Sequence, residues 1–217
     1  MSEADWYFDV VSPFAYLQWR TRERFAGRFH LRPIPVVLGA ILRHWGQKGP
    51  AEIAPKRFHT YRACQWRARQ LGVPFRFPPV HPFYPIDALR LLVAVGASEP
   101  AVDAVFDAAF GKGQDISDGT VLAQIGGALG VGDVAATIAR SDIKDRLRAN
   151  TEAAIALGVF GVPMLAVGNE LFWGEDMTDL ALAWSEDRSL LDADEMRRLR
   201  DLPSGQGRKS HDPDRAI

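Results

Sequence analysis

Two proline motifs contain residues whose types and spacing suit chemistry on an anion. Ser12-Pro13 follows a short apolar run near the start of the chain, and Gly161-Val162-Pro163 comes late in it. A serine at a helix start lies beside unpaired N–H groups and the positive end of the helix dipole, which favour a nearby thiolate. A cis proline ahead of a strand leaves the preceding backbone open to an added peptide strand. Taken alone, Ser12 can equally be a plain N-cap, which is the commoner use, and Pro163 an ordinary loop proline.

Cysteine usage limits the redox chemistry of the chain. Cys64 is the single cysteine, which excludes an intramolecular disulfide, a CxxC pair and a cysteine-rich zinc site. It lies in a helical segment, Tyr61 to Gln70, and we expect a packed, inert thiol. No metal site is expected either, because no ligand spacing links the candidate histidines, His30, His44, His59 and His81.

Composition predicts a soluble globular enzyme-sized chain. Its 217 residues are 47% hydrophobic and 24% charged, enough for one large domain or for one domain with an insertion. Lys and Arg number 26 and Asp and Glu 27, a net charge of -1, which provides no field to attract nucleic acid or an anionic membrane. The first residues do not resemble a signal peptide, and no apolar run is long enough to span a membrane. We therefore expect a cytoplasmic protein.

The two motifs need elements that place them. Trp6 to Val11 is aromatic and β-branched and predicts a buried strand, which leads into a helix over Pro13 to Gly27. Leu31 to Val37 predicts a second strand, and its two prolines favour a place at the sheet edge. From about Leu38 to Asn150 the pattern is helical, with candidate helices over Pro55 to Leu71, Ile86 to Ala97, Ala101 to Phe110, Gly119 to Leu129 and Asp133 to Arg140.

The last third of the sequence returns to strands. A helix over Asp142 to Leu157 precedes a strand over Met164 to Val167, a turn at Gly168-Asn169 and a strand over Glu170 to Trp173, after which Asp176 is expected to cap a last helix. This order predicts an α/β fold of thioredoxin-like type with a large inserted helical domain. The expected parts are a discontinuous thioredoxin-like domain over 1–37 and 142–190, a helical insertion over 38–141 and a disordered tail over 204–217.

Three stretches resemble one family. Tyr7 to Leu17, Gly158 to Pro163 and Phe172 to Asp176 closely resemble the 2-hydroxychromene-2-carboxylate isomerase family, which is similar to kappa-class glutathione transferases within the DsbA-like superfamily. The resemblance covers about residues 5 to 186. The motifs occur in the right order and at the expected distances, which makes them specific for the superfamily and less so for the isomerase.

The resemblance implies a glutathione site. It makes Ser12 the catalytic residue, whose hydroxyl bonds the glutathione sulfur and favours its thiolate. Val162 would pair through its backbone with the cysteinyl part of glutathione, next to a cis Pro163. Glu175 and Asp176 match positions that hold the γ-glutamyl end. Their carboxylates would form ion pairs with its ammonium group.

Two further positions are implied less directly. Gln47 and Lys56 fall at the spacing where relatives carry an Asn and a Lys that reach glutathione or the substrate carboxylate. Lys56 matches the family type, whereas Gln47 departs from it. For both residues the alternative is a solvated loop side chain.

The implied activity is a glutathione-dependent isomerisation. Glutathione acts as a cofactor, whose thiolate adds reversibly to a small aromatic carboxylate from aromatic degradation. The implied assembly is a homodimer. Two alternatives stay open: a kappa-like glutathione transferase that consumes glutathione, and a non-catalytic thioredoxin-like binding module. Aromatic side chains that can face a planar substrate, or simply pack in the core, are Phe14, Trp45, Phe83 and Tyr84.

Overall fold

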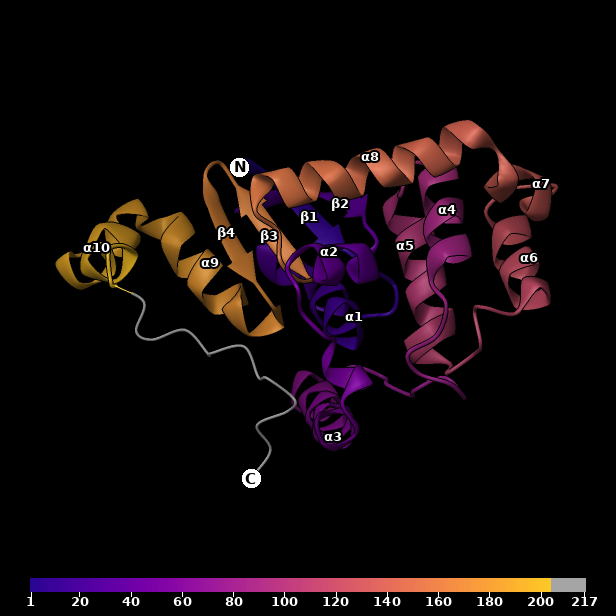
Figure 1. Ribbon diagram of the computed structural model, residues 1–217, viewed down its shortest axis with the longest axis horizontal. Coiled ribbons are helices and arrows are strands. Elements are labelled where there is room, and N and C mark those ends of the chain that lie inside the picture. The colour runs from indigo at the N-terminus through magenta and orange to yellow at the C-terminus, as the bar shows by residue number, and fades with distance from the viewer. Residues whose placement is uncertain (204–217) are drawn as a thin grey trace, which may run out of the picture. The chain divides into compact units, whose positions relative to one another are not determined.

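A mixed four-stranded sheet lies at the centre of the computed structural model, which describes residues 1–203 (Figure 1). The strand order is β2-β1-β3-β4. β1 (Ser2–Phe8) pairs in parallel with β2 (Phe29–Pro35) and antiparallel with β3 (Met164–Val167). β4 (Glu170–Trp173) pairs antiparallel with β3. The predicted strands around residues 6–11 and 31–37 and the late hairpin are therefore present.

The prolines and one aspartate explain where the first strands end. β2 is an edge strand, as Pro33 and Pro35 predict, because proline cannot donate to a second neighbour. β1 ends at Phe8 and not at Val11. Asp9 turns the chain there, since its carboxylate accepts the N–H groups of Val11 and Leu38. This turn delivers Ser12 to the start of the next helix.

Helices connect the strands of the sheet and pack against it. α1 (Pro13–Arg20) ends before a 3-10 turn over Arg22–Phe25, so the predicted helix to Gly27 is too long. α8 (Ser141–Leu157) runs along the sheet (Figure 1) and confirms the predicted long helix. A buried apolar layer between α8 and the sheet includes Ala154, Val159, Val162 and Met164. The residues on either side of Pro163, Val162 and Met164, thus belong to the core.

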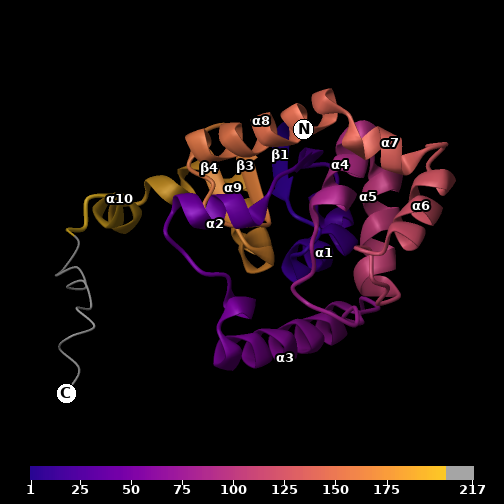
Figure 2. The ribbon, with the colours of Figure 1, turned by 45° about the vertical axis from the view of Figure 1, so that its right-hand side comes forward.

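The segment between β2 and α8 is helical, as predicted. Figure 2 shows four helices gathered beside the sheet, α4 (Ile86–Ala94), α5 (Glu99–Phe106), α6 (Gly119–Ala128) and α7 (Val134–Ala139), while α3 (Ala54–Leu71) lies apart from them and contacts α1. An aromatic cluster joins this segment to the sheet: Trp6 stacks on Phe8 at 4.6 Å and on Trp19 at 4.8 Å, and Phe8 lies 5.7 Å from Phe106 of α5. The first helix of this segment is α2 (Leu38–His44).

Helix α2 was not predicted from the sequence. Its N-cap residue, Val37, provides no side-chain cap, and a glycine follows Leu38. Tertiary contacts start this helix instead: the Val37 N–H donates to Thr151 Oγ1 at 3.1 Å, and the Leu38 N–H donates to Asp9 at 2.8 Å. Helix propensity depends on nearby residues, so it does not predict a helix that is started by partners distant in the sequence.

The chain divides into two compact units, Met1–Asp179 and the residues from Leu180 onward. The first holds the whole sheet, α1 to α8 and all the predicted site residues. The second contains most of α9 (Thr178–Glu186), a 3-10 turn over Arg188–Asp192 and α10 (Asp194–Arg200), which was not predicted. The finer division into 1–37, 38–141 and 142–190 stays a prediction, and the tail predicted over 204–217 lies outside the described residues.

No helix among residues 1–203 combines the length and apolar character needed to cross a membrane.

Candidate active site

Ser12 is the N-cap of α1, as the Ser-Pro motif predicts. Its backbone is extended, with φ -88 and ψ 112, and its Oγ accepts the N–H of Ala15 at 3.2 Å. Its own N–H donates to the Asp9 carbonyl at 3.0 Å. The residue is 6% exposed, so the hydroxyl lies at a protected helix N-terminus. Pro13 has no N–H, and the N–H groups of Ala15 and Tyr16 donate to Ser12, so the Phe14 N–H and the helix dipole are what favour negative charge beside the hydroxyl.

Val162-Pro163 is a cis peptide, which confirms the isomer predicted from Gly161-Val162-Pro163. The Ser12 hydroxyl lies against it and donates to the Val162 carbonyl, with 3.5 Å between the two oxygens. This hydrogen bond is long, and the hydroxyl proton can turn to a stronger acceptor such as a thiolate. Among residues 1–203, no acceptor takes the Val162 N–H. The two motifs therefore form one site.

The buried side chain of Asp9 stabilises the turn that carries Ser12. It is fully buried, and its two carboxylate oxygens accept the N–H groups of Val11 at 3.0 Å and Leu38 at 2.8 Å. Burial raises the pKa of Asp9 from 3.8 to about 7, although the two backbone donors act in the opposite direction. The carboxylate ties the start of α2 to the turn that carries Ser12.

His81, in the loop between α3 and α4, contacts the same turn. Its Nε2 lies 2.8 Å from the Val11 carbonyl, so Nε2 carries the proton, and its Nδ1 lies 2.9 Å from the Tyr61 hydroxyl. Burial lowers the pKa of His81, which favours the neutral imidazole. His81 is thus a structural partner of the residue that precedes Ser12.

Glu175 is buried in an ion pair. Its carboxylate is 2% exposed and accepts two hydrogen bonds from Arg67 of α3, at 2.7 and 2.8 Å. The hydrogen bond to Glu175 raises the pKa of Arg67, whose side chain is 33% exposed. Within this ion pair, the group that reaches solvent is therefore the Arg67 guanidinium. Asp176, which follows Glu175, is exposed.

Asp176 does not cap the last helix, which corrects the sequence expectation. It lies inside a 3-10 turn over Glu175–Met177, and α9 begins only at Thr178. Gly174 allows this turn because its φ of 100 lies in the region that favours glycine. The Gly174 N–H donates to the Pro163 carbonyl at 2.9 Å, so the turn is fastened to the cis-proline loop.

Gln18 joins α1 to this corner. Its Oε1 accepts the Trp6 indole N–H at 2.7 Å, and its Nε2 donates to the Gly174 carbonyl at 3.1 Å and to Thr178 Oγ1 at 3.0 Å. The amide is buried with its donors and acceptor used. It therefore sets the distance between the Ser12 helix and the Glu175 turn.

Gln47 and Lys56 lie at the surface, outside this cluster. Both side chains are exposed, and neither contacts Ser12, Val162 or Glu175 within the described part of the chain. Gln47 follows the end of α2, and Lys56 lies in the first turn of α3, the helix that also carries Arg67. Of the aromatic candidates, Phe83 is buried, Phe14 is partly buried, and Trp45 and Tyr84 are exposed.

Comparison with known proteins defines the family. Residues 3–183 match the DSBA-like thioredoxin domain. The chain belongs to this family. A solved 2-hydroxychromene-2-carboxylate isomerase superposes with a TM-score of 0.74 at 25% identity, covering 93% of this chain and 100% of that one. The predicted thioredoxin-like fold is confirmed.

Curated relatives of this DSBA-like domain fall into two enzyme groups. The 2-hydroxychromene-2-carboxylate isomerase of Sphingobium xenophagum is 29% identical, with 81% of this chain and 93% of the relative covered. That of Pseudomonas putida is 28% identical, with 79% and 88% covered. Glutathione S-transferase kappa 2 of Caenorhabditis elegans is 27% identical, with 74% and 79% covered. The resemblance stated from the three motifs is therefore confirmed.

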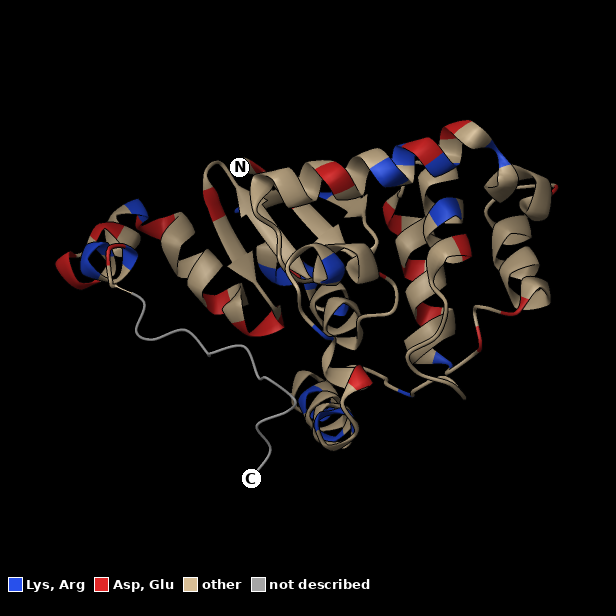
Figure 3. Ribbon diagram, in the orientation of Figure 1, with Lys and Arg blue, Asp and Glu red and all other residues tan. Residues whose placement is uncertain are grey.

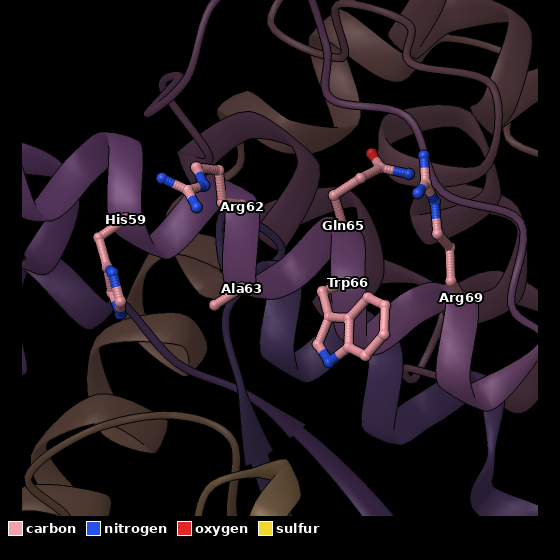
Figure 4. Close-up of a pocket in the computed structure, with 6 residues that line it drawn as sticks. All are labelled: His59, Arg62, Ala63, Gln65, Trp66 and Arg69. Carbon is pink, nitrogen blue, oxygen red and sulfur yellow. The ribbon is translucent and has the colours of Figure 1, made fainter.

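The single thiol of the DSBA-like domain is not available for chemistry. Cys64 is completely buried, and burial raises its pKa to about 12. Cys64 does not line the groove of about 460 Å³ that other side chains of α3 form (Figure 4). None of the residues lining this groove was predicted for the site; they are His59, Arg62, Ala63, Gln65, Trp66 and Arg69.

Sequence reasoning missed Asp9, Gln18 and Arg67, whereas His81, expected to be no metal ligand, has the structural role described above. Asp9 left a signal, since a carboxylate at the end of an apolar strand directly before a Ser-Pro turn needs buried partners. Gln18, on the helix that Ser12 begins, left a weaker one. Arg67 is one of several arginines on α3, where Figure 3 shows basic residues, and no local feature distinguishes it.

Proposed function

We propose that this chain is a glutathione-dependent isomerase of the 2-hydroxychromene-2-carboxylate type. The observation that carries the proposal is the Ser12 hydroxyl at the N-terminus of α1, placed against the cis Val162-Pro163 peptide. The similarity to isomerases and kappa transferases supports the same chemistry. A buried, protonated Cys64 leaves a bound small thiol as the sulfur nucleophile.

The protein's contribution is to ionise and orient this thiol. A free thiol is mostly protonated at neutral pH. The Ser12 hydroxyl would donate to the glutathione sulfur, and the α1 N-terminus would favour its negative charge. The open N–H of Val162 would pair with the cysteinyl backbone, which fixes the sulfur beside Ser12.

Arg67 and Asp176 suit the two charges of the γ-glutamyl end. Glu175 holds the Arg67 guanidinium in a fixed orientation, from which it can receive a carboxylate. Asp176, exposed on the next turn residue, can receive the ammonium. In this arrangement Glu175 acts through Arg67 as a positioning residue. Lys56 and Gln47 would meet the carboxylate of the substrate or of glutathione from the α2–α3 segment.

The proposed reaction is balanced without a further reactant. The hemiketal ring of the substrate first opens: the ring C–O bond breaks, the hemiketal hydroxyl becomes the ketone, and its proton passes to the phenolic oxygen. The thiolate then adds to the conjugated carbon of this ring-opened form, a C–S bond forms, and the displaced electron pair moves onto the ketone oxygen. The former double bond then rotates as a single bond. The electron pair returns, the C–S bond breaks, and the thiolate is released with the isomerised product. Glutathione is therefore not consumed.

The test is turnover of 2-hydroxychromene-2-carboxylate, followed by liquid chromatography with and without glutathione. We expect interconversion that requires glutathione and leaves its concentration unchanged. Consumption of glutathione with formation of a conjugate would identify the kappa-like transferase instead. Isothermal titration with glutathione tests the remaining alternative, a non-catalytic binding module. For such a module we expect no turnover and no glutathione binding at millimolar concentration.

The proposal also places the protein in the cytoplasm as a homodimer. Reduced glutathione is abundant in that compartment, which matches a chain that brings no reactive thiol of its own. Cell fractionation tests the location. Light scattering of the purified chain tests the assembly.

A further inference from the structure

A second groove, which Ser12 does not line, is formed by residues of α2, α4 and α8 and by Val37. Its volume is about 280 Å³, and none of its lining residues belongs to the Ser12 site. Its lining combines apolar residues with charged and polar ones: Val37, Ala40, Ile86, Leu147 and Ile155 are apolar, and Arg90, Lys144, Arg148, Glu152 and Thr151 are charged or polar. Apolar surface beside a few converging charges is the usual composition of a small-molecule site.

The cations of this groove are incompletely paired. The buried Nε of Arg90 has no hydrogen-bond partner, and its Nη1 meets Asp87 only at 3.3 Å. Lys144 has no ion pair among residues 1–203. Arg148 contacts Asp145 at 2.8 Å and Glu152 at 3.9 Å. Arg90 and Arg148 thus each face a carboxylate of their own helix, and Lys144 is the lining cation that has no carboxylate partner within residues 1–203.

The chemistry of the lining selects the ligand. The Arg90 guanidinium, whose ion pair with Asp87 is long, and the unpaired Lys144 ammonium favour a carboxylate, and the aliphatic lining residues favour an apolar body. The volume of about 280 Å³ lies just below the usual range of small-molecule pockets, about 300 to 1,000 Å³, which limits that body to about two fused rings. We infer that this groove binds a small apolar monocarboxylate, with the carboxylate between Arg90 and Lys144.

The probe is 2-naphthoate, titrated calorimetrically into the full chain. Lys144→Glu reverses one charge of the groove and should weaken binding about tenfold, and Ala40→Leu should weaken it by filling space among the apolar lining residues. Arg146→Gln is the matched control, because Arg146 is exposed on the same helix but does not line the groove, and binding should change less than about twofold. Circular dichroism verifies that each variant is folded.

Uncharged 2-naphthylmethanol and acetate separate the two contributions, and each should bind much more weakly than 2-naphthoate. Ser12→Ala should leave 2-naphthoate binding unchanged, because Ser12 is not part of the groove. The inference is overturned if 2-naphthoate fails to bind, if Lys144→Glu and Ala40→Leu bind it normally, or if Ser12→Ala abolishes binding, which would place the probe in the Ser12 site. None of these outcomes depends on the isomerase reaction.

Discussion

The hydroxyl oxygen of Ser12 lies 3.5 Å from the carbonyl oxygen of Val162, although 150 positions separate the two residues in the sequence. One end of this contact is a helix N-terminus, and the other is a cis peptide with an open N–H. This geometry supports the proposal that the pair receives glutathione, because the helix end favours a thiolate and the peptide edge favours an added backbone.

Ser12→Ala should raise the pKa of the bound glutathione thiol by about one to two units, because a hydrogen bond to a charged group contributes about 1.5 to 3 kcal/mol. Turnover at neutral pH should fall at least about tenfold. Ultraviolet absorbance of the thiolate across a pH titration measures the first effect, and the isomerase assay measures the second.

The same substitution also removes a helix cap, which by itself costs about 1 kcal/mol of stability. Asp133→Ala is the control, because Asp133 caps α7 by accepting the Ala136 N–H at 2.9 Å. It should cost similar stability and leave the thiol pKa alone. If Ser12→Ala behaves in the same way as this control, Ser12 is only a cap.

Asp9→Asn should change how stability depends on pH. The folded state raises the Asp9 pKa from 3.8 to about 7, so it binds the proton more tightly than the unfolded chain does. Asp9 therefore lowers the free energy of unfolding as pH rises from about 4 to about 7, by up to about 1.4 kcal/mol per unit. Asp9→Asn should remove this contribution, which urea denaturation at a series of pH values measures.

The Asp9→Asn substitution has a second, pH-independent effect. The new amide oxygen can accept only from one side while its NH₂ faces the other donor, so Val11 or Leu38 loses its partner at a cost of about 1 to 3 kcal/mol. Asp5→Asn is the control at the surface, where Asp5 pairs with Arg32. An identical pH slope in the wild type and in Asp9→Asn would contradict the assignment.

Glu175→Gln should destabilise the fold and also weaken glutathione binding. Removing one partner of a buried ion pair leaves the other uncompensated, and because Arg67 is partly exposed we expect a loss of about 2 kcal/mol. Loss of its orienting partner should raise the glutathione Kd severalfold without changing the pKa of the bound thiol. Calorimetric titration and thiolate absorbance measure these two quantities separately.

Arg67→Lys should reproduce the weaker binding, since an ammonium cannot make the two parallel hydrogen bonds that Glu175 accepts. Arg69→Gln serves as the control because Arg69 is exposed on the same helix and has no ion pair within residues 1–203. Glutathione affinity that survives both Glu175→Gln and Arg67→Lys would exclude this corner from the site.

Gly174→Ala should disturb the turn that carries Asp176. Its φ of 100 disfavours any side chain, and an added Cβ would overlap the Asp176 carboxylate. Gly168→Ala is matched for backbone strain, because Gly168 has a φ of 60 but open space around its Cβ position. Both variants should melt at lower temperature, but only Gly174→Ala should weaken glutathione binding. Equal affinity in the two variants would contradict a role for Asp176.

The sequence by itself determined the order of the four strands and of the helices other than α2 and α10, and it indicated the two motifs of the candidate site. Prolines, glycines and apolar periodicity act over a few residues, so the Ser12 cap, the edge strand with Pro33 and the turn before Pro163 could all be predicted. The single cysteine likewise excluded dithiol chemistry without any structure. These features depend on local backbone preference and on composition.

Only the tertiary structure decided what each polar side chain contacts. Glu175 meets Arg67 across 108 positions, and Asp9 meets the start of α2, a helix whose own sequence does not predict it. Such partners are chosen when distant segments pack and a buried charge must find a donor, which no local pattern records. Glu175 thus changed from an expected ligand for an ammonium to the group that orients a guanidinium.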